Sequence, residues 1–293
     1  MATDQKPTMK TLFTLPIAPS GSQPGGTLTC TTPFSPSSDS PSSDSPVQSR
    51  IYILTLSSPP DNRLTPPLIT ALLSALDLLE FSPEYPPGVV ITTSSLPKFF
   101  SNGLDLTHAL SDPSFLPQYL YPLFRRLLTY PMPTIALLNG HAFAGGLMLA
   151  MHMDYRVMNP SRGFACVNEL DFGVPLKPAM SAIFRAKCTP TTYRSLVLEA
   201  HRFGGGEAKA AGIVDLTGGL KEAIGFVEER KLTEKGKTGI YGLMKMEMYR
   251  ETVEGYLTAE GHEREEERVR RIVEGEKERK EKGRREVKGL SKL

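Results

Sequence analysis

Residues 139–147 read Asn-Gly-His-Ala-Phe-Ala-Gly-Gly-Leu (NGHAFAGGL), and this glycine-rich turn decides the fold. The apolar run PTIALL before it predicts a buried strand, and AGGLMLAMHMDYRVM (144–158) predicts a helix that opens on glycines. Backbone N–H groups at a helix start lack intrahelical partners and carry partial positive charge, and glycine lets a ligand approach them closely. The turn therefore indicates either a site for an oxyanion or tight strand–helix packing.

A second loop of the same kind lies upstream, where KFFSNGLDL (98–106) follows the apolar strand VVITTSS (89–95). Its Gly103 allows a turn that exposes the N–H of Leu104. Two backbone N–H groups from two strand ends that converge on one oxygen form an oxyanion hole. Neither loop contains G-x-G-x-x-G, so a dinucleotide-binding fold is not indicated.

Strands and helices alternate through the first two thirds of the chain, and helices dominate the rest. This order predicts an α/β core of stacked β-β-α units with a helical C-terminal part. We expect a Ser/Pro-rich, disordered insertion at 34–48, at the tip of a hairpin between GTLTCTT and RIYILTLSS. The predicted parts are an N-terminal extension at 1–25, a core at 26–200, a helical region at 201–259 and a charged tail at 260–293.

Composition excludes several classes of protein. The net charge of +2 over 293 residues gives no support for nucleic-acid binding. No stretch reaches the roughly 18 consecutive apolar residues of a membrane span. The three scattered cysteines, Cys30, Cys166 and Cys188, provide neither a disulfide framework nor a metal site, and they favour a reducing compartment.

The last three residues are Ser291, Lys292 and Leu293. A terminal S-K-L is an address that the peroxisomal import receptor reads, so we predict a peroxisomal protein with that receptor as a partner. The alternative is a chance tripeptide on a basic tail. The charged segment before it predicts a solvated helix or a frayed tail that presents the tripeptide.

Three blocks together resemble one family. KFFSNGLDL, PTIALLNGHAFAGGLMLAMHMDYRVM and RGFACVNELDFGVPL are similar, in order and spacing, to the crotonase (enoyl-CoA hydratase/isomerase) superfamily. The similarity spans roughly residues 49–215 and is greatest to the monofunctional peroxisomal Δ3,Δ2-enoyl-CoA isomerases. It implies a crotonase-type spiral of β-β-α units, a homotrimer or hexamer, and an acyl-CoA substrate. It implies no metal or redox cofactor, since CoA arrives with the substrate.

The resemblance also assigns the site. It places the thioester oxygen between the N–H groups of Leu104 and Gly145, and it makes Glu169 the catalytic base. The apolar residues around Glu169 are expected to raise its basicity by desolvation; they are Phe164, Val167, Leu170 and Phe172. The residues expected to contact substrate or CoA are Lys98, Ser101, Asn102, Gly103, Leu104, Asp105, Leu106 and Gly145.

The residue type at position 148 distinguishes an isomerase from a hydratase in this family. Hydratases of this family carry a second glutamate at the position that Met148 occupies, and methionine can neither position nor deprotonate water. One carboxylate suffices for a 1,3-proton shift from 3-enoyl-CoA to 2-trans-enoyl-CoA in fatty acid β-oxidation. Asp171 is expected to be structural, and His141 is expected to pack or to cap its loop.

Two alternatives stay open at the level of sequence. One is another crotonase reaction, hydration or thioester hydrolysis, on a specialised acyl-CoA. The other is an acyl-CoA-binding protein that keeps the fold without turnover.

Overall fold

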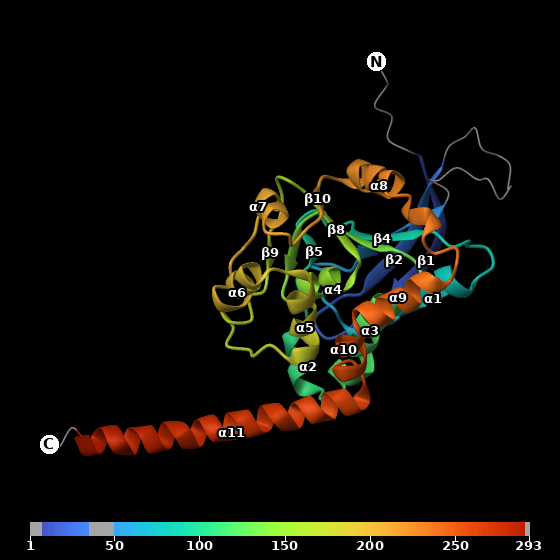
Figure 1. The fold of residues 1–293 in the computed structure, drawn as a ribbon. Coiled ribbons are helices and arrows are strands. Elements are labelled where there is room, and N and C mark those ends of the chain that lie inside the picture. Colours follow the sequence, from blue (N-terminus) through green and yellow to red (C-terminus); the bar gives the residue numbers. More distant parts are fainter. Residues whose placement is uncertain (1–7, 35–49, 291–293) are drawn as a thin grey trace.

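The computed structural model describes residues 8–34 and 50–290 (Figure 1). Nearly all of the predicted insertion at 34–48 lies outside the described residues, and so does the tripeptide 291–293. Within the described ranges, strands form a seven-stranded sheet of order β1-β2-β3-β4-β6-β8-β10 and a three-stranded sheet of order β5-β7-β9. The strands are β1 (Thr8–Ile17), β2 (Gly26–Phe34), β3 (Ile51–Ser57), β4 (Val89–Ser94), β5 (Phe99–Ser101), β6 (Thr134–Leu138), β7 (His141–Phe143), β8 (Tyr155–Met158), β9 (Ala165–Cys166) and β10 (Leu216–Thr217).

The helices follow the predicted alternation. Upstream of the glycine-rich turn they cover the large sheet, and downstream of β8 they dominate the chain, as the α/β class with a helical C-terminal region requires. The helical segments are α1 (Pro66–Phe81), α2 (Leu106–Ser111), the π-helix η2 (Leu116–Leu120), α3 (Tyr121–Thr129), α4 (Gly145–His152), α5 (Pro178–Lys187), α6 (Pro190–Leu198), α7 (Gly205–Ala210), α8 (Leu220–Glu229), the 3-10 helix η3 (Leu232–Glu234), α9 (Ile240–Met248), α10 (Arg250–Gly255) and α11 (Ala259–Leu290).

The N-terminal strands make an antiparallel meander. β2 pairs with β3, which confirms the predicted hairpin, and β1 pairs with β2 from Thr8 to Ile17. The boundary that we predict at residue 25 is therefore wrong, because residues 8–17 belong to the sheet. The strand signal was present in the sequence, because β1 contains Met9, Leu12, Phe13, Leu15 and Ile17 among polar residues, although only Ile17 is buried.

Alternate residues of the parallel strands enter two cores on opposite faces of the large sheet. In β3, Tyr52, Leu54 and Leu56 pack in the core that contains α1, α3 and α4. Ile51 and Ile53 pack in a smaller core against α8. Burial on both faces explains why these strands are continuous apolar runs.

The predicted helix 144–158 is wrong in its second half. α4 ends at His152, and residues 155–158 form β8, which pairs in parallel with β6 and β10. An apolar run does not by itself distinguish a buried helix from a buried strand. Here the pairing of Tyr155–Met158 between two strands determines the outcome.

His152 ends α4 inside the core and gives a prediction about acid stability. Its ring stacks on Phe124 at 3.8 Å, its Nδ1 donates to the carbonyl of Met148 at 2.7 Å, and burial lowers its pKa from 6.5 to about 3. Only the unfolded chain binds this proton between those values, so the residue costs stability as the pH falls below about 6.5. Urea unfolding at pH 8 and pH 5 is expected to show a smaller acid-induced loss in His152→Leu than in the wild type.

The control for this prediction is His201→Gln, at an exposed histidine. It should lose as much stability between pH 8 and pH 5 as the wild type does. An unchanged acid-induced loss in His152→Leu would contradict the role of His152.

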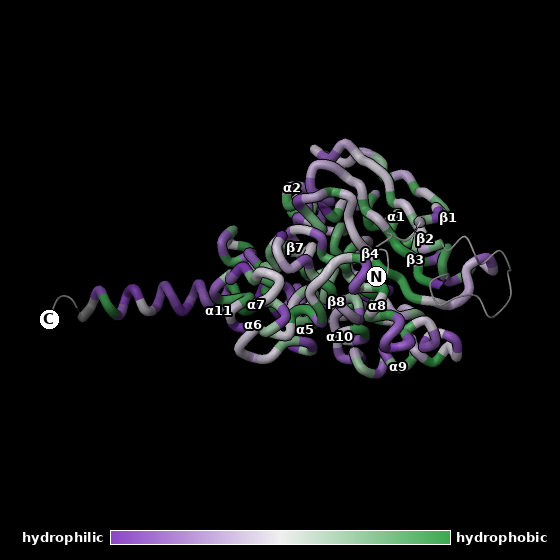
Figure 2. Tube along the Cα trace, turned by 90° about the horizontal axis from the view of Figure 1, so that it is seen from above, coloured by the Kyte–Doolittle hydropathy of each residue, from purple (hydrophilic) through white to green (hydrophobic). Residues whose placement is uncertain are grey.

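The charged tail is a continuous helix, α11, that extends away from the body (Figure 1) and is largely hydrophilic (Figure 2). Residues 270–282 are exposed all round. Ion pairs one turn apart support the helix, among them Glu267 with Arg271 at 3.0 Å and Glu276 with Arg279 at 2.8 Å. Such pairs add a small stabilisation to the helix where it has no packing partner among the described residues.

Candidate active site

The small sheet brings the three sequence blocks together. β5 comes from the KFFSNGLDL loop, β7 from the NGHAFAGGL turn and β9 from the RGFACVN segment, and they pair in parallel. The approach is close, since a Cβ added at Gly146 would lie 2.3 Å from the carbonyl oxygen of Ser101. Only glycine permits α4 to start against β5.

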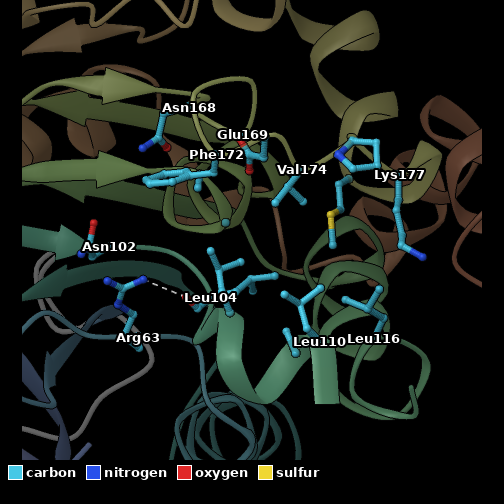
Figure 3. A pocket seen from close by; sticks show the side chains of 16 residues that line it. Arg63, Asn102, Leu104, Leu110, Leu116, Asn168, Glu169, Phe172, Val174 and Lys177 are labelled. Atoms are coloured by element: carbon cyan, nitrogen blue, oxygen red, sulfur yellow. Dashed lines mark hydrogen bonds between the residues drawn. The ribbon is translucent and has the colours of Figure 1, made fainter. Parts of the chain in front are cut away.

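A cavity of about 260 Å³ lies beside this sheet (Figure 3). Glu169, Leu104 and Gly145, the three predicted catalytic residues, all line it. Its polar lining also includes Arg63, Asn102, Asn168 and Lys177. Its apolar lining includes Leu106, Leu110, Leu116, Phe172, Val174 and Met180.

The first oxyanion loop turns at Gly103. Its φ is +82°, a left-handed conformation that favours glycine, and an added Cβ would lie 3.0 Å from the backbone nitrogen of Gly145. The Ser101 hydroxyl donates to the carbonyl of Asn62 at 2.8 Å and accepts from the N–H of Gly103 at 3.2 Å. The Ser101 side chain is fully buried, and its two hydrogen bonds connect the turn to Asn62.

The second loop is held in a strained conformation at Ala144. This residue has φ 50° and ψ −123°, which costs a non-glycine residue on the order of 1–3 kcal/mol. Its N–H donates to the carbonyl of Cys166 at 2.9 Å, which fixes the loop against β9. The unusual ψ sets the plane of the next peptide and so the direction of the Gly145 N–H at the start of α4.

The backbones of Leu104 and Gly145 lie close together at the wall of the cavity. A Cβ added at Gly145 would lie 3.3 Å from the backbone nitrogen of Leu104. Neither N–H donates to an acceptor within residues 8–34 and 50–290. Two free donors side by side at the wall of a cavity are the arrangement that binds a thioester oxygen or an enolate.

A segment that the sequence analysis missed positions the first loop. Asp61 accepts from the Asn102 side chain at 2.7 Å and pairs with Arg63 at 3.0 Å, and Arg63 donates to the carbonyl of Leu104 at 2.9 Å. The buried Asn62 donates to the carbonyl of Phe100 at 3.0 Å. The turn-forming sequence PPDNRL was the available signal, but contacts across some forty residues are not visible in it.

Glu169 opens a tight turn after β9. Its carbonyl accepts from the N–H of Val174 at 3.0 Å, and its carboxylate faces the cavity wall with one buried oxygen, Oε2, that has no hydrogen-bond partner in the described chain. Burial raises the pKa of this carboxyl from 4.5 to about 7. The backbone N–H of Glu169 donates to the same carboxylate and lowers its pKa, but the effect of burial is larger. A carboxylate with one unpartnered oxygen and a raised pKa is a stronger base than a solvated one.

The apolar shell expected around Glu169 is only partly present. Val167 is buried, and Phe172 lines the cavity although it is 62% exposed, whereas Phe164 and Leu170 are 42% and 55% exposed and do not line it. The side chains directed outward from this turn do not desolvate the carboxylate. The α2 and α5 side of the cavity supplies that surface instead, through residues such as Leu106 and Met180.

The remaining predicted contact residues lie around the cavity. Asn102 and Leu106 line it, whereas Lys98, Ser101, Gly103 and Asp105 do not. Lys98 is exposed and lies over the Phe99 ring at 5.2 Å, and Asp105 caps α2 by accepting from the N–H of His108 at 3.3 Å.

His141 has a packing role. Its Nδ1 accepts from the N–H of Phe164 at 3.2 Å, and its ring contacts the Phe99 ring at 5.4 Å between centroids. This is the packed, loop-capping position that we predict. Met148 is buried in the main core and does not line the cavity.

Two further findings concern the described residues. None of their helices is long and apolar enough to cross a membrane. The same ranges contain no group of three or more His, Cys, Asp and Glu residues arranged to hold a metal ion.

Comparison with known proteins gives one family. A profile described as enoyl-CoA hydratase/isomerase matches residues 47–238. Enoyl-CoA delta isomerase 1, peroxisomal, of Arabidopsis thaliana is 36% identical over 216 residues, covering 70% of this chain and 89% of the relative. Enoyl-CoA delta isomerase 3 of the same plant is 34% identical over 214 residues, with coverage of 69% and 89%.

Solved structures agree on the fold. The human mitochondrial delta3-delta2-enoyl-CoA isomerase superposes with a TM-score of 0.65 at 24% identity, covering 74% of this chain and 86% of its own. The predicted crotonase-type α/β fold is therefore confirmed. With the profile match over most of the chain, the protein belongs to the enoyl-CoA hydratase/isomerase family.

Proposed function

We propose that this protein is a Δ3,Δ2-enoyl-CoA isomerase that uses Glu169 as its one base. The observation that carries the proposal is that Glu169 shares a cavity with the free N–H groups of Leu104 and Gly145. It is the one acidic residue among the described residues of the lining. The names of the Arabidopsis thaliana relatives, enoyl-CoA delta isomerases, support the same activity.

The thioester oxygen accepts from Leu104 and Gly145, which directs C2 of the acyl group toward Glu169. The carboxylate removes a C2 proton, the electron pair moves into the thioester, and a dienolate forms with its charge on that oxygen. The protonated Glu169 then returns the proton to C4, and the double bond becomes conjugated. Each oxyanion donor contributes about 2.7–4 kcal/mol in well-studied enzymes. This stabilisation of the dienolate makes removal of the weakly acidic C2 proton feasible.

Hydration needs a second group to hold water, and the cavity supports the one-base reaction better. The side chain at the position of the second carboxylate, Met148, is packed in the core. The proposed proton transfer requires no metal or redox cofactor.

We also propose that Lys98, Ser101, Gly103 and Asp105 contact the substrate or its CoA group. Assembly into a trimer or hexamer is a further proposal, and light scattering of the purified protein tests it.

Incubation with 3-hexenoyl-CoA and, separately, with 2-trans-hexenoyl-CoA tests the function. We expect the first to be converted to the conjugated isomer and the second to remain unhydrated. Formation of 3-hydroxyhexanoyl-CoA from the second would assign a hydratase, and release of free CoA would assign a thioesterase. Binding of both without turnover would favour a non-catalytic acyl-CoA-binding protein.

The raised pKa of Glu169 predicts the pH dependence of kcat/KM. Because the base must be ionised, kcat/KM for 3-hexenoyl-CoA is expected to be level above pH 7 and to fall about tenfold per pH unit below it. Initial rates between pH 5 and pH 9 at constant ionic strength measure this. A profile that stays level down to pH 5 would show that Glu169 keeps an ordinary pKa.

We further propose that the protein acts in the peroxisome, which is supported by the similarity to the peroxisomal enoyl-CoA delta isomerase 1 of Arabidopsis thaliana. The import receptor would bind Ser291-Lys292-Leu293. Imaging of the chain with a fluorescent protein fused at its N-terminus tests this. Punctate peroxisomal signal is expected, and Leu293→Asp should make it diffuse; a diffuse signal from the unchanged chain would contradict the localisation.

A further inference from the structure

The apolar side of the cavity ends at a charged residue. Leu110, Leu116 and Met180 line this side. Lys177, the residue immediately before α5, lines the cavity as well. Figure 3 shows the Lys177 amine directed away from Glu169. The thioester is held at Leu104 and Gly145, so an acyl chain that extends along the apolar lining runs toward Lys177.

Lys177 is paired with a residue from a distant part of the chain. Its Nζ donates to the carboxylate of Glu266, in the first turns of α11. The side chains are 32% and 38% exposed. The cavity wall and the C-terminal helix are therefore joined by a partly exposed ion pair.

The base of α11 is attached to the wall by few contacts. His262 packs edge-on against Tyr121 at 5.5 Å, next to the π-helix η2, and Arg264 donates to the carbonyl of Gly255 at 2.6 Å. Beyond Arg270 the helix has no buried side chain among its described residues. In the first turns Gly261 is buried and His262 and Glu265 are half-buried, but no described residue of α11 belongs to either apolar core. Separation of these turns from α5 therefore opens neither core.

The volume of the cavity limits the length of acyl chain that it can enclose while Lys177 and Glu266 stay paired. At about 260 Å³ it is smaller than the roughly 300–1,000 Å³ of pockets that enclose drug-sized ligands. A volume of this size accommodates a short acyl chain more readily than a long one, and Lys177 is among the residues that a longer chain along the apolar lining would meet. Partly exposed ion pairs are weak enough for a ligand to displace at modest cost.

We propose that the Lys177–Glu266 pair is a gate at the acyl end of the cavity and determines which chain lengths bind best. With the gate closed, short acyl chains are accommodated. A long chain has to separate Glu266 from Lys177 and pass between α5 and α11. The inference rests on the proposed function only in that it takes an acyl-CoA as the ligand.

Calorimetric binding of two unreactive saturated thioesters, hexanoyl-CoA and dodecanoyl-CoA, tests the gate. Glu266→Gln is expected to raise the affinity ratio of dodecanoyl-CoA to hexanoyl-CoA about two- to fivefold, the factor that such a pair contributes. The exchanged pair Lys177→Glu/Glu266→Lys should restore the wild-type ratio. High salt should raise the wild-type ratio toward that of Glu266→Gln, because salt screens the pair.

Glu276→Gln is the matched control, since it breaks an ion pair with Arg279 on the exposed part of the same helix. It should leave the ratio unchanged. An unchanged ratio in Glu266→Gln, or an equal change in both affinities, would overturn the gate. Binding is measured without turnover, so a wild type that shows the gate but does not isomerise 3-hexenoyl-CoA would refute only the proposed function.

Discussion

Replacing Glu169 by Gln is expected to lower kcat for 3-hexenoyl-CoA about 10²- to 10⁴-fold, the contribution of a positioned acid–base group. The amide keeps the size of the side chain but takes no proton. KM should change little, because the oxyanion donors Leu104 and Gly145 are backbone groups that the substitution leaves in place. Steady-state kinetics at pH 8 separate the two parameters.

The same substitution predicts a gain in stability. Burial of the ionised carboxylate at pH 8 disfavours the folded state, whereas at pH 4 the carboxyl is neutral in the folded protein. Glu169→Gln should therefore raise Tm at pH 8 and have little effect at pH 4. Thermal unfolding at the two pH values measures this.

Asp171→Asn is the control for both effects. Asp171 is an exposed carboxylate two residues away and does not line the cavity. It should change neither kcat nor the pH dependence of Tm. A Glu169→Gln protein with full activity would remove Glu169 from the mechanism.

Gly103→Ala is expected to have an effect of similar size through the backbone. The added methyl group would lie 2.9 Å from the carbonyl oxygen of Phe143 and 3.0 Å from the nitrogen of Gly145, so one of the two loops has to move. Misplacing one oxyanion donor costs about 10²- to 10³-fold in kcat. Kinetics on folded protein, checked by circular dichroism, measure the loss.

Gly212→Ala controls for backbone strain. Gly212 also has a positive φ, +72°, but an added Cβ would meet no atom within 4 Å, and the residue is outside the cavity lining. Both variants are expected to lose about 1–2 kcal/mol of stability from the left-handed conformation. Only Gly103→Ala should lose activity, and equal activity in the two would argue against the oxyanion role of this loop.

The sequence was sufficient to predict the parts of the site that are local. Glycine and apolar patterns around Gly103 and Gly145 reflect constraints on neighbouring residues, so the two strand-end loops are predictable. That the two loops lie next to each other was predicted only from the resemblance to the crotonase superfamily. The structure shows its physical basis, which is that Gly146 allows α4 to begin against β5.

The features that the sequence did not reveal depend on distant contacts. Tyr155–Met158 is a strand because β6 and β10 flank it, although the run continues the apolar pattern of α4. Arg63 reaches the loop at Leu104 across forty residues, and Lys177 meets Glu266 from an even more distant segment. Local propensity contains no information about such pairs.

Transfer of one proton between two carbons by Glu169 is the central claim, and isotopic labelling tests it most directly. The substrate is 3-hexenoyl-CoA with both C2 hydrogens replaced by deuterium, converted in ordinary water and analysed by mass spectrometry. A single carboxyl with a buried, unpartnered oxygen predicts that part of the product carries deuterium at C4. Product that carries only solvent hydrogen at C4, at every extent of conversion, would contradict the one-glutamate shuttle.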